Sequence, residues 1–137
     1  MKKLSEIVDL KKIRVVNRAI DKAHGLPNEC YTNEDYLPVE RAKIFEDKWV
    51  VIGIGNSIPN IGDAKPFDLL GIPLIILRDK NNQIRVYHNV CSHRGYKILQ
   101  EDIKIKNVLR CPYHSWSYNT EGKLVATPHI GGMNKHN

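Results

Sequence analysis

The spacing of apolar residues predicts a helical N-terminal stretch followed by a β-rich remainder. Apolar positions recur at near-helical intervals over residues 4–23, and Gly25-Leu-Pro27 predicts the end of this helix. A second, short helix is expected near Pro38–Asp47, because proline is well tolerated in a first helical turn. We therefore expect an N-terminal helix within residues 1–25 and one domain over residues 26–137.

From Trp49 onward the pattern changes to short apolar runs separated by turn residues, which is typical of β-strands. Such a series predicts an all-β core, an antiparallel sandwich or barrel from which two hairpin loops project. The expected strands are Trp49–Ile54, Pro73–Arg78, Ile84–Val90, a strand marked by Ile103, Ile105 and Leu109, and the pair Ser117–Asn119 and Lys123–Ala126.

Two short-spaced pairs of cysteine and histidine carry the candidate chemistry, Cys91-Ser-His93 and Cys111-Pro-Tyr-His114. Zinc accepts two thiolates and two imidazoles, but the common zinc pattern pairs Cys with Cys and His with His, whereas each pair here is mixed. A Rieske-type 2Fe-2S cluster takes both thiolates on one iron and both imidazoles on the other, and this raises its reduction potential. The mixed pairs favour this cluster, with binding loops at about residues 88–96 and 110–118.

The residues around both pairs extend the pattern. They are Asn89-Val-Cys-Ser-His-Arg-Gly95, Cys111-Pro-Tyr-His-Ser-Trp-Ser-Tyr118 and, further upstream, the segment Val39–Trp49. Together they resemble the N-terminal Rieske domain of the alpha subunit of ring-hydroxylating oxygenases, over about residues 26–131. The resemblance implies that a 2Fe-2S cluster, which transfers single electrons, is bound by four residues: Cys91, His93, Cys111 and His114.

The respiratory-chain Rieske proteins are a poorer match. They carry an additional cysteine in each loop, joined as a disulfide, and the corresponding positions here are Tyr96 and Tyr113. A serine that hydrogen-bonds a bridging sulfide in those proteins falls at Trp116. Both departures predict a potential at the low end of the Rieske range, about −150 mV rather than about +300 mV.

In the oxygenases a separate catalytic domain holds a mononuclear iron through two histidines and a carboxylate. No Asp or Glu follows Glu121 in this chain, and only His129 and His136 lie further on, so no such site and no catalytic residue is expected. The resemblance therefore implies an oxidoreductase component. Its electron donor would be a ferredoxin or flavin reductase, and its acceptor a mononuclear-iron catalytic domain or oxygenase subunit, usually in a trimer.

Composition limits the location and the partners. The 137 residues carry a net charge of +6, without the interleaved basic and aromatic residues of a nucleic-acid module. There is no apolar run of membrane-spanning length and no signal-peptide core, so a cytoplasmic protein without membrane contact is expected. Three cysteines fit a reducing compartment, and Cys30, outside both pairs, is expected to be a small buried apolar residue.

Three functional classes remain open from the sequence. The first is the Rieske part of an oxygenase alpha subunit, which the N-terminal helices and the segment Tyr31–Trp49 favour. The second is a stand-alone Rieske ferredoxin that carries electrons between proteins; the end of the chain at Asn137 favours either this class or a truncated product. The third is a structural zinc module, which would be colourless and would contain no sulfide.

Overall fold

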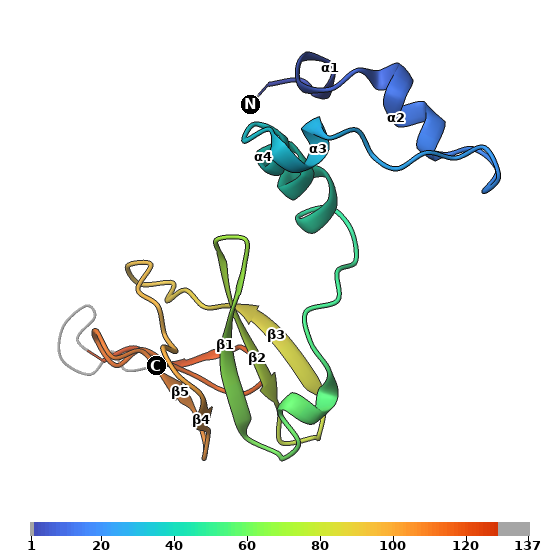
Figure 1. The fold of residues 1–137 in the computed structure, drawn as a ribbon. Helices are drawn as coiled ribbons and strands as arrows, with labels where there is room; N and C mark the ends of the chain where they lie inside the picture. The colour runs from blue at the N-terminus through green and yellow to red at the C-terminus, as the bar shows by residue number, and fades with distance from the viewer. Residues whose placement is uncertain (1, 129–137) are drawn as a thin grey trace. The chain divides into compact units, whose positions relative to one another are not determined.

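The computed structural model describes residues 2–128, and the chain divides into two compact units, residues 1–51 and 52–137. The first unit is built from short helices and the second from two antiparallel sheets (Figure 1). This is the predicted class, an all-β core preceded by N-terminal helices. Within residues 2–128, no helix combines the length and the apolar character needed to cross a bilayer. His129 and His136 lie outside the described residues.

The first unit contains several short helices in place of the single one predicted over residues 4–23. That prediction is wrong because Val8 is extended and Asp9 caps a new helix, accepting a hydrogen bond from the Lys11 N–H at 2.8 Å. The second predicted helix is confirmed, and it ends in a π-helical turn. The elements are α1 (Leu4–Ile7), α2 (Leu10–Val16), α3 (Glu29–Thr32), α4 (Tyr36–Glu40) and η1 (Arg41–Phe45).

A small apolar core lies within the first unit. Ile7 and Val8 at the end of α1 are buried together with Val39 of α4. Cys30 packs against this cluster but is only partly buried, less than the sequence led us to expect. The extended conformation of Val8 thus breaks the helix while its side chain still contributes to the core.

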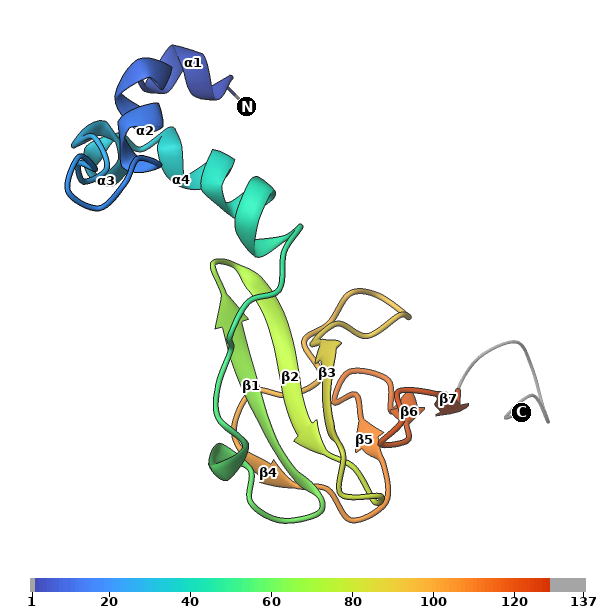
Figure 2. The same cartoon turned by 90° about the vertical axis from the view of Figure 1, so that its right-hand side faces the viewer.

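The second unit consists of a four-stranded and a three-stranded antiparallel sheet (Figures 1 and 2). A 3₁₀ turn, η2 (Gly55–Ser57), precedes the strands. The first sheet has the order β3-β2-β1-β4 and is formed by β1 (Asp63–Leu69), β2 (Ile72–Arg78), β3 (Ile84–His88) and β4 (Ile103–Lys104). The second has the order β5-β6-β7 and is formed by β5 (Leu109–Arg110), β6 (Ser117–Tyr118) and β7 (Leu124–Ala126).

Tight turns fix the register of the larger sheet. Between β1 and β2, Leu70 and Gly71 both have positive φ, 52° and 86°, as a two-residue type I′ turn requires. This turn pairs Leu69 with Ile72 and sets Ala64 opposite Leu77. Because alternate residues of a strand share a face, the register directs Ile75 and Leu77 into the core cluster, while Leu74 and Ile76 are buried on the opposite face of β2.

The core of the second unit joins both sheets through buried aliphatic side chains. Tyr87 of β3 and Tyr118 of β6 pack against it. Tyr118 matters for the site, because its ring belongs to the core while its hydroxyl reaches a predicted cluster ligand. The buried residues are Ala64, Ile75, Leu77, Leu99, Ile105 and Leu109.

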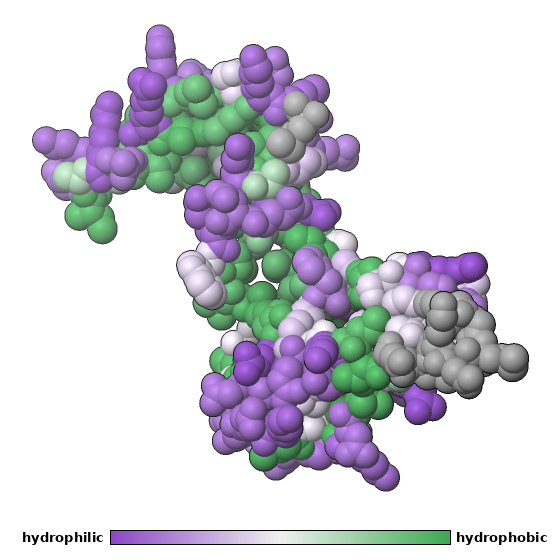
Figure 3. Space-filling view, turned by 180° about the vertical axis from the view of Figure 1, so that it is seen from behind, coloured by the Kyte–Doolittle hydropathy of each residue, from purple (hydrophilic) through white to green (hydrophobic). Residues whose placement is uncertain are grey.

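Three strand assignments differ from the sequence prediction. The strand marked by Ile103, Ile105 and Leu109 is in fact two strands, β4 and β5, which belong to different sheets. The segment Trp49–Ile54 forms no strand, and Trp49 and Val51 are exposed; hydrophobic residues are visible at the surface in Figure 3. Conversely β1 was not predicted, because Pro66 and charged residues interrupt its pattern. Pro66 is tolerated because β4 pairs only with Asp63 and Ala64 of β1. The N–H that Pro66 lacks would therefore have had no partner on the β4 side of the strand.

Candidate metal centre

The two predicted ligand loops lie side by side at one end of the sheets, drawn in gold and orange in Figure 2. One follows β3 and leads toward β4, and the other links β5 to β6. Their tips meet, since the ring centroids of His93 and His114 are 4.8 Å apart. The fold therefore brings together the two sequence pairs that the motif analysis selected.

Both loops have the same pattern of backbone hydrogen bonds. In each, the cysteine N–H donates to the carbonyl five residues later, and the cysteine carbonyl accepts from the N–H four residues later. These bonds measure 2.8 and 2.9 Å in the loop of Cys91, and 2.8 and 3.0 Å in the loop of Cys111. Each cysteine thus begins a closed turn that presents the following side chains outward.

The residue four positions after each cysteine adopts a left-handed conformation. The φ angle is 68° at Gly95 and 61° at Ser115. An added Cβ at Gly95 would meet no atom of the described residues within 4 Å, so space does not require a glycine here. Its positive φ is what favours glycine at this position. Ser115 adopts the same conformation with a side chain, which costs an L-residue about 1–2 kcal/mol.

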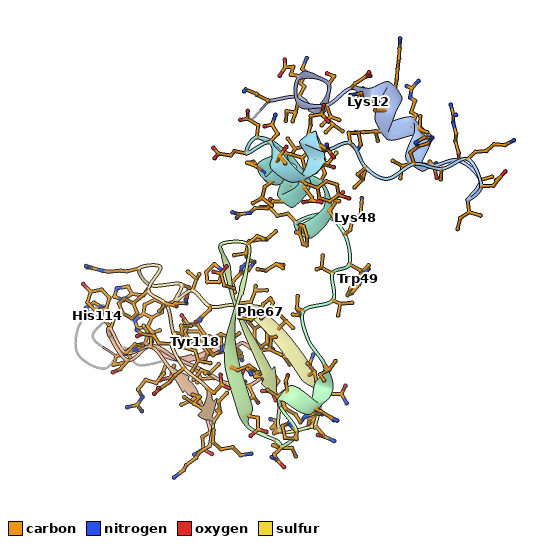
Figure 4. The ribbon with its side chains drawn as sticks, viewed as in Figure 1. Lys12, Lys48, Trp49, Phe67, His114 and Tyr118 are labelled. Atoms are coloured by element: carbon orange, nitrogen blue, oxygen red, sulfur yellow. The ribbon has the colours of Figure 1, made fainter. Side chains whose placement is uncertain are left out.

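The two cysteines form the inner side of the site. Cys91 and Cys111 are each 2 % exposed, both are free thiols, and the neighbouring Cys111 thiol acts to lower the pKa of Cys91. The Tyr118 hydroxyl lies 3.3 Å from the Cys91 sulfur (Tyr118 and His114 are labelled in Figure 4). A sulfur pair buried beside the core is thereby shielded from water.

Hydrogen bonds around Cys91 favour its thiolate. Burial raises the pKa of the Cys91 thiol. Hydrogen bonds from the Tyr118 hydroxyl and from the backbone N–H groups of His93 and Arg94 lower it by more, so the net pKa is below its ordinary value. The thiolate is the form that binds a metal. The protein atoms alone therefore prepare this sulfur for ligation.

The two histidines form the outer side of the site. Both are only partly buried, in contrast to the cysteines. The indole of Trp116 stacks on His93 with a centroid distance of 4.7 Å and an interplanar angle of 8°. Tyr113 packs on His114 at 3.9 Å and is itself 52 % exposed. Each imidazole is thus held by an aromatic neighbour, and this side faces the surface.

Asn89 braces the base of the first loop. It is fully buried, donates from Nδ2 to the Leu99 carbonyl at 2.6 Å and accepts from the Leu99 N–H at 2.8 Å. The Asn89 amide thus pairs with both backbone groups of Leu99, ten residues further along the chain, in the way that a backbone amide of a neighbouring strand would. Asn89, Ser92 and Tyr118 all lie within the motif segments, but the sequence alone assigned no contacts to them.

The donor set fits a binuclear cluster. A Rieske cluster takes two cysteines on one iron and two histidines on the other, so it requires pairs of like donors from different loops. The fold supplies such pairs, one cysteine and one histidine from each loop. The arrangement defines an iron–sulfur electron-transfer domain.

Comparison with known proteins gives the family. The model of the Rieske [2Fe-2S] domain matches residues 48–137. The chain belongs to this family, and it therefore binds a 2Fe-2S cluster. Its homologues are alpha subunits of Rieske oxygenases, which agrees with a role in electron transfer and decides against the structural zinc module.

Individual relatives support the same assignment. The chain is 36 % identical over 110 residues to the biphenyl 2,3-dioxygenase alpha subunit of Rhodococcus jostii, covering 80 % of this chain and 24 % of the relative. Naphthalene 1,2-dioxygenase from a Rhodococcus species is similar in structure, with a TM-score of 0.73, 31 % identity, and coverage of 88 % and 26 %. A quaternary ammonium Rieske monooxygenase, described for carnitine oxidation and inter-subunit electron transfer, gives a TM-score of 0.70, 29 % identity, and coverage of 81 % and 30 %. The chain spans about a third or less of the length of the curated relatives it matches.

Proposed function

We propose that Cys91 and Cys111 bind one iron of the cluster, that His93 and His114 bind the other, and that the domain passes single electrons to an oxygenase site. The observation that carries the ligand set is the meeting of the two loops, with the imidazoles 4.8 Å apart and both sulfurs buried. When bound, the cluster supplies one-electron redox chemistry. The ligating side chains hold it, while the buried surroundings of the sulfurs exclude water.

The histidine side is the proposed exit for the electron. It faces the surface, and Tyr113 and Trp116 enclose the two imidazoles there. By similarity to the relatives, the acceptor is a mononuclear-iron site in an oxygenase catalytic domain on a neighbouring subunit. One relative is described with inter-subunit electron transfer, which supports this direction.

The proposal extends to the partners. A ferredoxin or flavin reductase would supply electrons from NAD(P)H, and the complete assembly would hydroxylate an organic substrate with O₂ as a homo-oligomer. The relatives act on aromatic hydrocarbons in some cases and on a quaternary ammonium compound in another, so both substrate classes are candidates. The free state of all three cysteines supports a reducing location such as the cytoplasm.

The test is the cofactor content of anaerobically purified protein and of ligand variants. Wild-type protein should contain iron and acid-labile sulfide in equal amounts, about two of each per chain. After reduction it should give a Rieske EPR signal, and its midpoint should be about −150 mV. Cys91→Ala should lose the cluster, because the iron would lack one of its two thiolates. His114→Cys, if it retains the cluster, should lower the midpoint by on the order of 100 mV, because it restores negative charge.

Matched controls separate ligation from general damage. Cys30→Ala and His88→Ala change the same residue types outside the ligand set and should keep full iron and sulfide content. Retention of a full cluster in Cys91→Ala would contradict the ligand set. A clearly positive midpoint in wild-type protein would contradict the low-potential assignment.

A further inference from the structure

Ser92 lies between the proposed ligands Cys91 and His93 and contacts the hydroxyl of Tyr118 twice. Its backbone N–H donates to the Tyr118 oxygen at 3.0 Å, and its own hydroxyl oxygen lies 2.8 Å from the same atom. That atom lies 3.3 Å from the Cys91 sulfur. Tyr118 is fixed because its ring packs against the apolar core.

Counting protons gives the direction of these hydrogen bonds once Cys91 binds iron. A ligating cysteine is a thiolate, which can only accept. Tyr118 has one hydroxyl proton, and the charged sulfur is a stronger acceptor for it than the neutral Ser92 hydroxyl, so Tyr118 offers its lone pairs to Ser92. The Ser92 hydroxyl must therefore donate to Tyr118, as the Ser92 N–H already does. The result is a one-way chain from Ser92 through Tyr118 to Cys91.

We propose that the Ser92 hydroxyl raises the reduction potential of the cluster by polarising the Tyr118 hydroxyl that hydrogen-bonds Cys91. The proposal rests on the ligation by Cys91 proposed above. Successive hydrogen bonds strengthen one another by about 10–30 % per bond. One-electron reduction by an external donor would add one negative charge to the cluster that Cys91 helps to hold, while no bond breaks and the proton stays on Tyr118. The chain of hydrogen bonds therefore stabilises the reduced state more than the oxidised one.

Ser92 is exposed, so its side chain contributes no apolar packing that would explain the contact otherwise.

The isosteric pair Ser92→Val and Ser92→Thr isolates the hydroxyl in the full chain. The midpoint of each variant is measured by spectroelectrochemical titration, together with its iron and sulfide content. Ser92→Val should reduce the equilibrium constant for reduction about two- to threefold. This corresponds to about 18–28 mV at 59 mV per tenfold change for one electron. Ser92→Thr retains the hydroxyl and should leave the midpoint at the wild-type value.

A double-mutant cycle tests whether the effect passes through Tyr118. In the Tyr118→Phe background the receiving oxygen is gone, so Ser92→Val should no longer change the midpoint. An equal decrease in that background would overturn the proposal. An unchanged midpoint in Ser92→Val with full iron and sulfide content would overturn it as well.

Cluster loss is also decisive. If Ser92→Val loses the cluster while Ser92→Thr keeps it, the hydroxyl acts in assembly and the proposal fails. If both lose it, Ser92 has a packing role and the proposal fails too. A fully loaded Cys91→Ala variant would instead refute the ligand set, so the two failures are distinguishable.

Discussion

Asp79, a fully buried carboxylate just after β2, defines the turn that leads into β3. Its Oδ1 accepts from the N–H groups of Asn81 and Gln83 at 2.9 and 2.8 Å, and its Oδ2 accepts from Arg85 at 2.9 Å. Burial raises the pKa of Asp79, but these bonds outweigh it and hold the net pKa below its ordinary value. A single residue thus joins the two strands that precede the first ligand loop.

The depressed pKa of Asp79 predicts a loss of stability in acid. A carboxylate whose pKa is lower in the folded state contributes stability above its unfolded pKa, about 3.8, and loses it as the pH falls through the folded value. Asp79→Asn should therefore unfold at lower urea concentration at pH 7, and the difference from wild type should shrink below about pH 3. Urea unfolding of iron-depleted protein, followed by circular dichroism, measures this without cluster loss. The exposed Glu101→Gln is the control, and a difference that persists in acid would contradict the prediction.

The edge of the larger sheet depends on one close backbone approach. β4 pairs with β1 through only two residue pairs, and the Ile105 N–H extends this contact by donating to the Gly62 carbonyl at 2.7 Å. Gly62 has a φ of 86°, and an added Cβ would lie 2.4 Å from the Ile105 carbonyl oxygen. Ile105 belongs to the core, so the approach links the sheet edge to the buried cluster.

Gly62→Ala should destabilise the second unit by about 2–4 kcal/mol, because it combines a left-handed backbone with a clash against another backbone. Chemical denaturation, compared with wild type, provides the measurement. Gly53→Ala is the matched control: its nearest contact would be the Ser57 hydroxyl at 4.0 Å, and it should change stability by less than about 0.5 kcal/mol. Equal stability of Gly62→Ala and wild type would mean that this backbone approach is not maintained in solution.

Elements that a local sequence pattern encodes were predicted, whereas elements that depend on tertiary pairing were missed. β2 and β3 were predicted because their apolar runs are continuous and bounded by turn residues, and the ligand loops because their motif is local in sequence. β1 was missed because a proline is tolerated in a strand only where its missing N–H faces no partner. Whether β4 pairs opposite Pro66 depends on the tertiary structure and cannot be read from the local sequence. The same holds in the site: the contact of Tyr118 with Cys91 spans 27 residues, and no local pattern encodes it.

At the scale of the whole molecule, the cluster residues all belong to one compact unit. The family match begins at residue 48, close to the start of the second unit at residue 52. Both ligand loops, the core beneath them and the described contacts of Cys91 lie within this unit. The helical unit contributes no described residue to the proposed ligand set.

A shortened chain of residues 48–137 should therefore fold and bind the cluster alone. Its iron and sulfide content per chain and its EPR spectrum should equal those of the full chain, because every described contact of the site is retained. The midpoints of the two proteins, measured side by side, should agree within experimental error. A shortened chain that is folded by circular dichroism but lacks the cluster would show that the helical unit takes part in cofactor binding.

The paired hydrogen bonds between Asn89 and Leu99 fasten the base of the first ligand loop to the buried core of the second unit. Both backbone groups of Leu99 are satisfied by this one side chain. A substitution that removes the amide would therefore leave two buried backbone groups without partners and release the loop from its support.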